Sequence, residues 1–129
     1  MSLVERFCVR LLGRRIPPPA DAPAGLIPEG VVFREGRLIP GIGGLLARMG
    51  QPAAAVTLGR TIVVHPDAHL SRQLLVHELT HVRQWRADPL FTLRYTIAAL
   101  RHGYTNNPYE VEARQAAAAY PPPSAERHT

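Results

Sequence analysis

The sequence predicts one domain of the α+β class, and three observations support this. The chain has 129 residues, 46% of them hydrophobic and 19% charged, which is enough for one core and too short for two comfortable domains. Two β-prone runs separated by Gly59-Arg60 predict a hairpin. Three segments with helical spacing follow that hairpin, so strands and helices occupy separate stretches of the chain.

The first 15 residues predict an amphipathic helix. Apolar residues recur at helical spacing, and Glu5, Arg6 and Arg10 stand between them. These charges exclude a secretory signal, which needs an uninterrupted apolar stretch. We expect the helix to pack on the body of the protein, with peripheral membrane contact as the alternative because arginines flank its apolar side. No segment has the ~20 apolar residues of a membrane span, and we expect a cytoplasmic protein.

Proline marks the boundaries of the folded core. Residues 16–29 hold five prolines and predict an extended connector, residues 30–120 a core, and residues 121–129 a flexible tail. At the start of the core, Val31–Phe33 and Arg37–Ile39 predict a hairpin around Glu35-Gly36. A helical turn is expected after it, through Leu45, Leu46 and Met49.

The rest of the core has clearer signals for where elements begin and end. Ser71 is a suitable N-cap, Gly103 ends a helical pattern, and Pro108 suits the first turn of a helix. The expected elements are strands 54–58 and 61–64, followed by helices from Arg72 to about Arg86, from Pro89 to His102, and from Pro108 to Tyr120.

The charge distribution and the single cysteine argue against two classes of function. The net charge is +5 and all fifteen basic residues are arginine, but they are dispersed, which argues against a nucleic-acid surface. Cys8 alone cannot form an internal disulfide or a multi-thiolate metal site. Histidine, aspartate and glutamate therefore remain as candidate metal ligands.

The strongest motif is His77-Glu78-Leu79-Thr80-His81, an HExxH sequence in the first helix of the core. His77 and His81 are four residues apart, so both imidazoles lie on one helix face and can bind one zinc ion. Glu78 points about 100° around the helix from His77. It is therefore suited to take a proton from a water molecule that the metal activates.

The sequence around the motif favours a metal site over two ordinary surface histidines. Leu74, Leu75, Val76 and Val82 make this helix apolar, so the motif is expected to be half-buried. Burial of two histidines and a glutamate without partners would cost considerable free energy.

A third ligand must come from elsewhere in the chain. On the third helix Glu110 and Glu112 point nearly 200° apart, so only one of them can face the metal. Glu110 also fits a capping box behind Asn107, which is a purely structural role. The residues alone leave these candidates open: His65, His69, His102, Asp67, Asp88, Glu110 and Glu112.

At this point the sequence resembles a known family. HELTHVRQW followed by NPYEVEARQA is similar to the small, glutamate-ligated zinc metallopeptidases of the zincin group, closest in style to the DUF4157-like minimal domains. The resemblance covers roughly residues 54 to 118. It implies a minimal zincin-like fold, with a small sheet packed on an active-site helix and a second ligand-bearing helix. It also implies Zn²⁺ as the cofactor, Glu110 as the third ligand, and an edge strand before the motif that binds extended substrate.

The resemblance implies hydrolysis of peptide bonds in a peptide or protein substrate, with Glu78 as the general base. Candidate donors to the developing oxyanion are Tyr104, Tyr109, His102 and His65. The chain departs from the family pattern at Arg114, where relatives often carry an aspartate that orients a zinc-bound histidine. The alternative partner for Arg114 is Glu110, one turn earlier on the same helix. The alternative function is therefore a zinc-binding scaffold or interaction module without catalytic activity.

Overall fold

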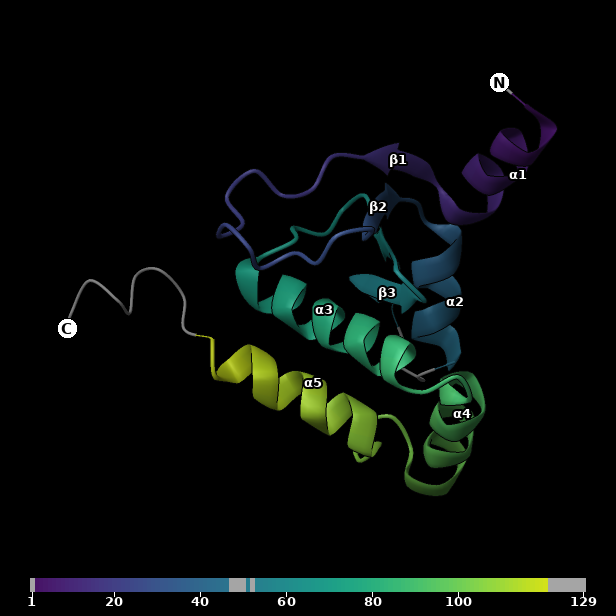
Figure 1. The fold of residues 1–129 in the computed structure, drawn as a ribbon. Coiled ribbons are helices and arrows are strands. Elements are labelled where there is room, and N and C mark those ends of the chain that lie inside the picture. Colours follow the sequence, from purple (N-terminus) through teal and green to yellow (C-terminus); the bar gives the residue numbers. More distant parts are fainter. Residues whose placement is uncertain (1, 47–50, 52, 121–129) are drawn as a thin grey trace. The chain divides into compact units, whose positions relative to one another are not determined.

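The computed structural model describes residues 2–46, 51 and 53–120, and the chain divides into two compact units (Figure 1). The described residues form five helices and four strands, which confirms the α+β class. The predicted flexible tail, 121–129, lies outside the described residues. Unit 1, Met1–Leu70, holds α1 (Leu3–Leu12), β1 (Arg14–Ile16), β2 (Val32–Glu35), α2 (Leu38–Leu46), β3 (Ala55–Leu58) and β4 (Thr61–Val64); unit 2, Ser71–Thr129, holds α3 (Arg72–Ala87), α4 (Phe91–His102) and α5 (Pro108–Ala118).

Unit 1 is built on a mixed sheet of strand order β1-β2-β4-β3. The predicted hairpin of β3 and β4 is confirmed, with Leu58 opposite Thr61 and Ala55 opposite Val64. Strand β4 also pairs with β2 in parallel, so it is a central strand and buries Ile62 and Val63 completely. A central strand with neighbours on both sides is expected to be continuously apolar, as this one is.

The predicted hairpin around Glu35-Gly36 is wrong. Strand β2 ends at Glu35, and the amide of Gly36 donates to the carbonyl of Val64, which continues the parallel ladder beyond the strand. The next residues then enter α2, whose third residue is Pro40. Proline is tolerated there because the amides of a first helical turn have no partner within the helix.

Helix α2 begins earlier than the predicted turn and contains three glycines. Glycine disfavours helices, which is why the sequence predicts only the end of this one. At Gly43 the absence of a side chain serves packing: a Cβ there would lie 2.7 Å from Cγ2 of Val56 on β3. Met49, which the predicted turn included, lies outside the described residues.

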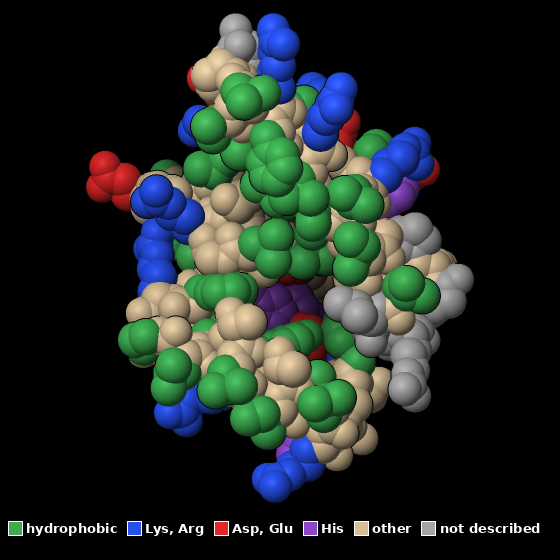
Figure 2. Space-filling view, turned by 90° about the vertical axis from the view of Figure 1, so that its right-hand side faces the viewer, with side chains coloured by type: hydrophobic (Ala, Val, Ile, Leu, Met, Phe, Trp, Pro, Cys, Tyr) green, Lys and Arg blue, Asp and Glu red, His purple; other side chains and the backbone are tan. Residues whose placement is uncertain are grey.

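Helix α1 ends at Leu12, and Arg14–Ile16 form a strand where helix and connector were expected. Gly13 makes this corner, with φ +96° and its Cα so close to Glu35 that a Cβ would overlap the carbonyl. The helix contacts α2 and β1 but buries none of its residues. Figure 2 shows hydrophobic side chains, with arginines around them, gathered over α1 and α2.

Unit 2 consists of three helices, in which α3 packs on both α4 and α5 (Figure 1). Helix α4 begins two residues later than predicted and ends at Gly103, where φ is +76°. Helix α5 begins at Pro108 as predicted and ends two residues earlier than predicted. Among the described residues, no helix is both long and apolar enough to cross a membrane.

Candidate metal centre

Helix α3 presents the HExxH motif from a well-anchored first turn. The hydroxyl of Ser71 accepts a hydrogen bond from the amide of Leu74, 3.1 Å away, which caps the helix as predicted. Glu78 and His81 are both buried, whereas the side chain of His77 is 16% exposed. The imidazoles of His77 and His81 meet edge-to-face on one side of the helix, with ring centroids 5.0 Å apart.

Helix α5 presents Glu110 to the same place. Asn107 caps the helix through its side-chain oxygen, which accepts from the amide of Tyr109 at 3.0 Å. Glu110, at the third helical position, turns its carboxylate toward the two histidines, and its side chain is only 3% exposed. Its side chain is therefore engaged with the histidines of α3.

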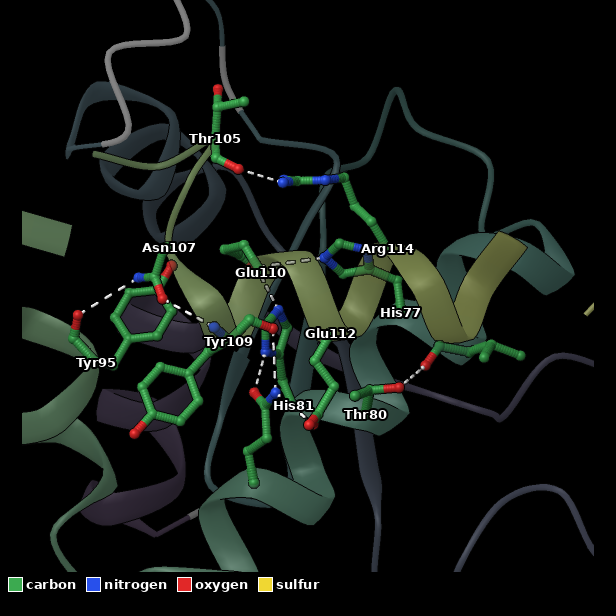
Figure 3. A network of polar contacts seen from close by, with 12 residues as sticks. His77, Thr80, His81, Tyr95, Thr105, Asn107, Tyr109, Glu110, Glu112 and Arg114 are labelled. Atoms are coloured by element: carbon green, nitrogen blue, oxygen red, sulfur yellow. Dashed lines mark hydrogen bonds and ion pairs between the residues drawn. The ribbon is translucent and has the colours of Figure 1, made fainter. Parts of the chain in front are cut away.

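The donor atoms of His77, His81 and Glu110 converge within unit 2 (Figure 3). Oε1 of Glu110 lies 3.4 Å from Nε2 of His77 and 2.5 Å from Nε2 of His81. One ligand atom from each of the three residues lies within 4.8 Å of the others, and no other such group of three occurs among the described residues. The three side chains are positioned to hold a metal ion.

The chemistry of this donor set fits zinc. Two imidazoles and one carboxylate are a known ligand set for catalytic zinc, and they leave a fourth position open. Tetrahedral bonds of about 2.0–2.1 Å would put the ligand atoms roughly 3.3 Å apart. His77 and Glu110 already have this separation, whereas His81 and Glu110 must move apart by somewhat less than 1 Å.

The charges in this cluster stabilise one another. Burial alone would raise the pKa of Glu110, but hydrogen bonds with His77 and His81 lower it to about 2. Burial would lower the pKa of His81, but the hydrogen bond with Glu110 and the negative charge of Glu78 raise it to about 9. A buried anion therefore faces a protonated imidazole, and a cation that binds here replaces a proton.

Two tyrosines of unit 2 interact with Glu110. Burial, followed by the charge of Glu110, raises the pKa of Tyr104 to about 12 and that of Tyr95 above its usual range, and a hydrogen bond with Glu110 contributes to both. Both phenols therefore keep their protons at neutral pH and can donate. Tyr104 was a predicted donor, whereas Tyr95 was missed because it lies on a helix with no motif of its own.

Glu112 does not join the three converging side chains. Its Oε1 accepts a hydrogen bond from Nε2 of Gln84 at 2.9 Å, on the side of α5 that contacts α3. The same Gln84 presents its Oε1 to Nδ1 of His81 at 2.8 Å. Gln84 was not among the predicted site residues, although its place three residues after His81 puts it on the same helix face.

The other candidate ligands lie apart from this cluster or in the other unit. Asp88 pairs with Arg94 at 2.8 Å in the turn before α4, and His102 is exposed at the end of α4. Nδ1 of His65 accepts from the amide of Asp67 in unit 1, where His69 is exposed.

Arg114 and Tyr109 have contacts of their own. The guanidinium of Arg114 donates to the carbonyl oxygen of Thr105 (Figure 3). The ring of Tyr109 packs edge-to-face on Phe91, with centroids 5.1 Å apart. Tyr109 is thus part of an aromatic cluster between α4 and α5.

The comparisons with known proteins give one family match. Residues 46–89 match the family model of the eCIS core domain, which agrees with the DUF4157-like resemblance. Neither the curated proteins nor the solved structures contain a significant match. The matched segment includes His77, Glu78 and His81 and ends before Glu110, so the placement of Glu110 at the site rests on the geometry of α5.

Proposed function

We propose that this chain is a zinc-dependent peptidase whose metal is held by His77, His81 and Glu110. The convergence of these three side chains on one point is the observation that carries the proposal. A second carboxylate, that of Glu78, is buried on the same helix as the two histidines and does not serve as a ligand in this scheme. When bound, zinc would polarise a carbonyl and make a water molecule more acidic.

The residues of the chain have distinct tasks in this proposal. Glu78 accepts the proton of the attacking water and passes it to the amine that leaves. The phenol of Tyr104, which its raised pKa of about 12 keeps protonated, donates to the oxygen on which negative charge develops. The substrate would be a peptide or an extended segment of a protein.

The test replaces Glu78 by Gln, which keeps the shape and removes the base. We expect Glu78→Gln to bind one zinc per chain, as the wild type does, and to lose peptide hydrolysis by about 10²- to 10⁴-fold. Zinc is measured by inductively coupled plasma mass spectrometry, and cleavage by mass spectrometry of a peptide library. Glu5→Gln, on the exposed α1, is the matched control and keeps both properties.

A zinc-binding scaffold without catalytic activity is the second candidate. Its support is Arg114, which occupies the place of an orienting aspartate and is engaged with Thr105. A wild type that binds zinc and cleaves nothing in the library, with no difference from Glu78→Gln, would favour this candidate and reject the peptidase.

A further inference from the structure

We propose that Gln84 and Glu112 are positioning residues for the metal centre. Glu112 orients the amide of Gln84, and Gln84 then keeps the proton of His81 on Nδ1 and leaves Nε2 available for a metal ion. This inference rests on the proposed metal centre, and it does not depend on hydrolysis.

The contacts form a continuous chain from His81 on α3 to Glu112 on α5, within unit 2. Gln84 is 8% exposed, and its Oε1 lies 2.8 Å from Nδ1 of His81. Its Nε2 lies 2.9 Å from Oε1 of Glu112 and 3.1 Å from the carbonyl oxygen of Tyr109. The amide of Gln84 is thus engaged at both ends, by α3 and by the first turns of α5.

The orientation of this amide follows from its partners. An ionised carboxylate and a backbone carbonyl are acceptors only, so the NH₂ group of Gln84 must face Glu112 and Tyr109. A flipped amide would set an oxygen against two oxygens and would lose both hydrogen bonds. Oε1 therefore faces His81.

The tautomer of His81 follows from the orientation of Gln84. An amide oxygen is an acceptor, so Nδ1 of His81 must carry the hydrogen that lies between them. A neutral imidazole has one N–H group, and with that hydrogen on Nδ1 the lone pair is on Nε2. Nε2 is the atom that faces Glu110, at 2.5 Å, where a metal ion would be bound.

This arrangement explains two features of the sequence together. The resemblance described above implies an orienting aspartate at position 114, where this chain has an arginine. Gln84 supplies an orienting partner from α3, the helix that also carries His77 and His81. Glu112, which competed with Glu110 for the role of third ligand, acts one step farther from the metal.

The first test measures the zinc affinity of Gln84→Leu by competition with a chromophoric chelator. Loss of an orienting partner typically weakens metal binding by about 10- to 100-fold, and we expect a loss in this range. Gln73→Leu, on the exposed side of the same helix, is the matched control and should bind as the wild type does. An affinity of Gln84→Leu within about twofold of the control would overturn the proposal.

A charge swap keeps the proposal testable if Gln84→Leu fails to fold. Gln84→Glu alone sets two carboxylates against each other and should weaken zinc binding. Gln84→Glu combined with Glu112→Gln restores a donor–acceptor pair and should recover most of the lost affinity. A double variant no better than the single one would contradict the role of Glu112.

The nitrogen shifts of the imidazoles give a readout that a merely structural role would not move. In the zinc-loaded wild type, long-range ¹H–¹⁵N correlation should show His81 protonated at Nδ1 and bound to the metal through Nε2. In Gln84→Leu the hydrogen-bonded Nδ1–H signal of His81 should be lost, while the signals of His77 stay. Binding of the wild-type His81 through Nδ1 would overturn the inference.

These outcomes separate the inference from the proposed function. A wild type that binds no zinc would reject the metal centre and Gln84's role with it. A wild type that binds zinc and cleaves no peptide would reject hydrolysis alone, and the affinities above would still decide the role of Gln84 and Glu112.

Discussion

Helices α1 and α3 both mix apolar and charged residues at helical spacing, yet they distribute them in opposite ways. Helix α3 buries Glu78, His81 and Gln84, whereas α1 buries none of its residues and leaves Leu3 and Phe7 83% and 64% exposed. Charged residues are seldom buried without partners, and large apolar side chains are seldom exposed in contiguous groups. The two helices therefore point to two different kinds of site.

The buried polar side chains of α3 and the exposed apolar side chains of α1 are tolerated for different physical reasons. The buried charge of His81 on α3 is stable because α5 supplies a partner of opposite charge in Glu110. The exposed apolar side of α1 needs no such compensation, because a residue that is exposed when folded and when unfolded contributes little to stability. Substitutions in α3 and its partners should thus have large effects, and substitutions in α1 small ones.

The largest effect is expected from Glu110→Ala. It removes the anionic ligand and leaves His81 without its buried partner, so we expect loss of stoichiometric zinc and a free energy of unfolding lower by about 3–5 kcal/mol without metal. Zinc content and urea denaturation measure the two effects. Glu5→Ala on α1 should change stability by less than about 1 kcal/mol. Zinc retained in Glu110→Ala and lost in Glu112→Ala would assign the third ligand to Glu112 instead.

Core packing gives the next largest contrast. Leu75 on α3 is 1% exposed, and Leu75→Ala should lower the free energy of unfolding by about 2–5 kcal/mol because it leaves a cavity. Phe7→Ala on α1 should change it by about 0.5 kcal/mol or less. Equal effects in thermal unfolding would show that the apolar side of α1 is covered in solution.

The pH dependence of zinc binding sharpens the account of α3. At pH 7.5 His81, with a pKa of about 9, holds a proton that zinc must displace, whereas Glu110, with a pKa of about 2, holds none. Binding should therefore release about one proton, and affinity should rise about tenfold per pH unit below 9. Calorimetry in two buffers of different ionisation enthalpy measures this release. Affinity that stays constant from pH 6.5 to 8 would contradict it.

The smallest effect concerns the predicted membrane contact of α1. Exposed Leu3, Val4 and Phe7, with Arg6 and Arg10 beside them, predict weak binding to vesicles that contain anionic lipid. A helix of about three turns should bind weakly, and salt should reduce the binding. Flotation of wild type and Phe7→Ser with anionic and neutral vesicles measures it. Equal flotation with both kinds of vesicle, or with both proteins, would reject the contact.

The parts of the fold that the sequence predicts are those set by local signals. Ser71 and Gly103 mark helix ends, and Gly59-Arg60 marks a hairpin turn. Local signals do not predict strand β1 or the full length of helix α2, because β1 is three residues long and α2 contains three glycines and a proline. The parallel pairing of β2 with β4 joins residues about thirty positions apart, and nothing in the local sequence specifies it.

The site, too, has features that local sequence predicts and features that depend on how the helices pack. The i, i+4 spacing of His77 and His81 predicts that they share a face, since that is a property of the helix alone. The choice between Glu110 and Glu112 depends on how α5 is rotated against α3, which the spacing cannot give. Gln84 was missed because a glutamine on a helix is ordinary until its amide is seen between two partners.

The most direct test of the account is anomalous diffraction from crystals of the wild-type protein grown with zinc, measured on both sides of the zinc absorption edge. We predict one strong peak per chain, about 2.0–2.2 Å from Nε2 of His77, Nε2 of His81 and a carboxylate oxygen of Glu110. A zinc-containing crystal with no peak at these atoms, or with a peak bound by Glu112 in place of Glu110, would contradict the proposed metal centre.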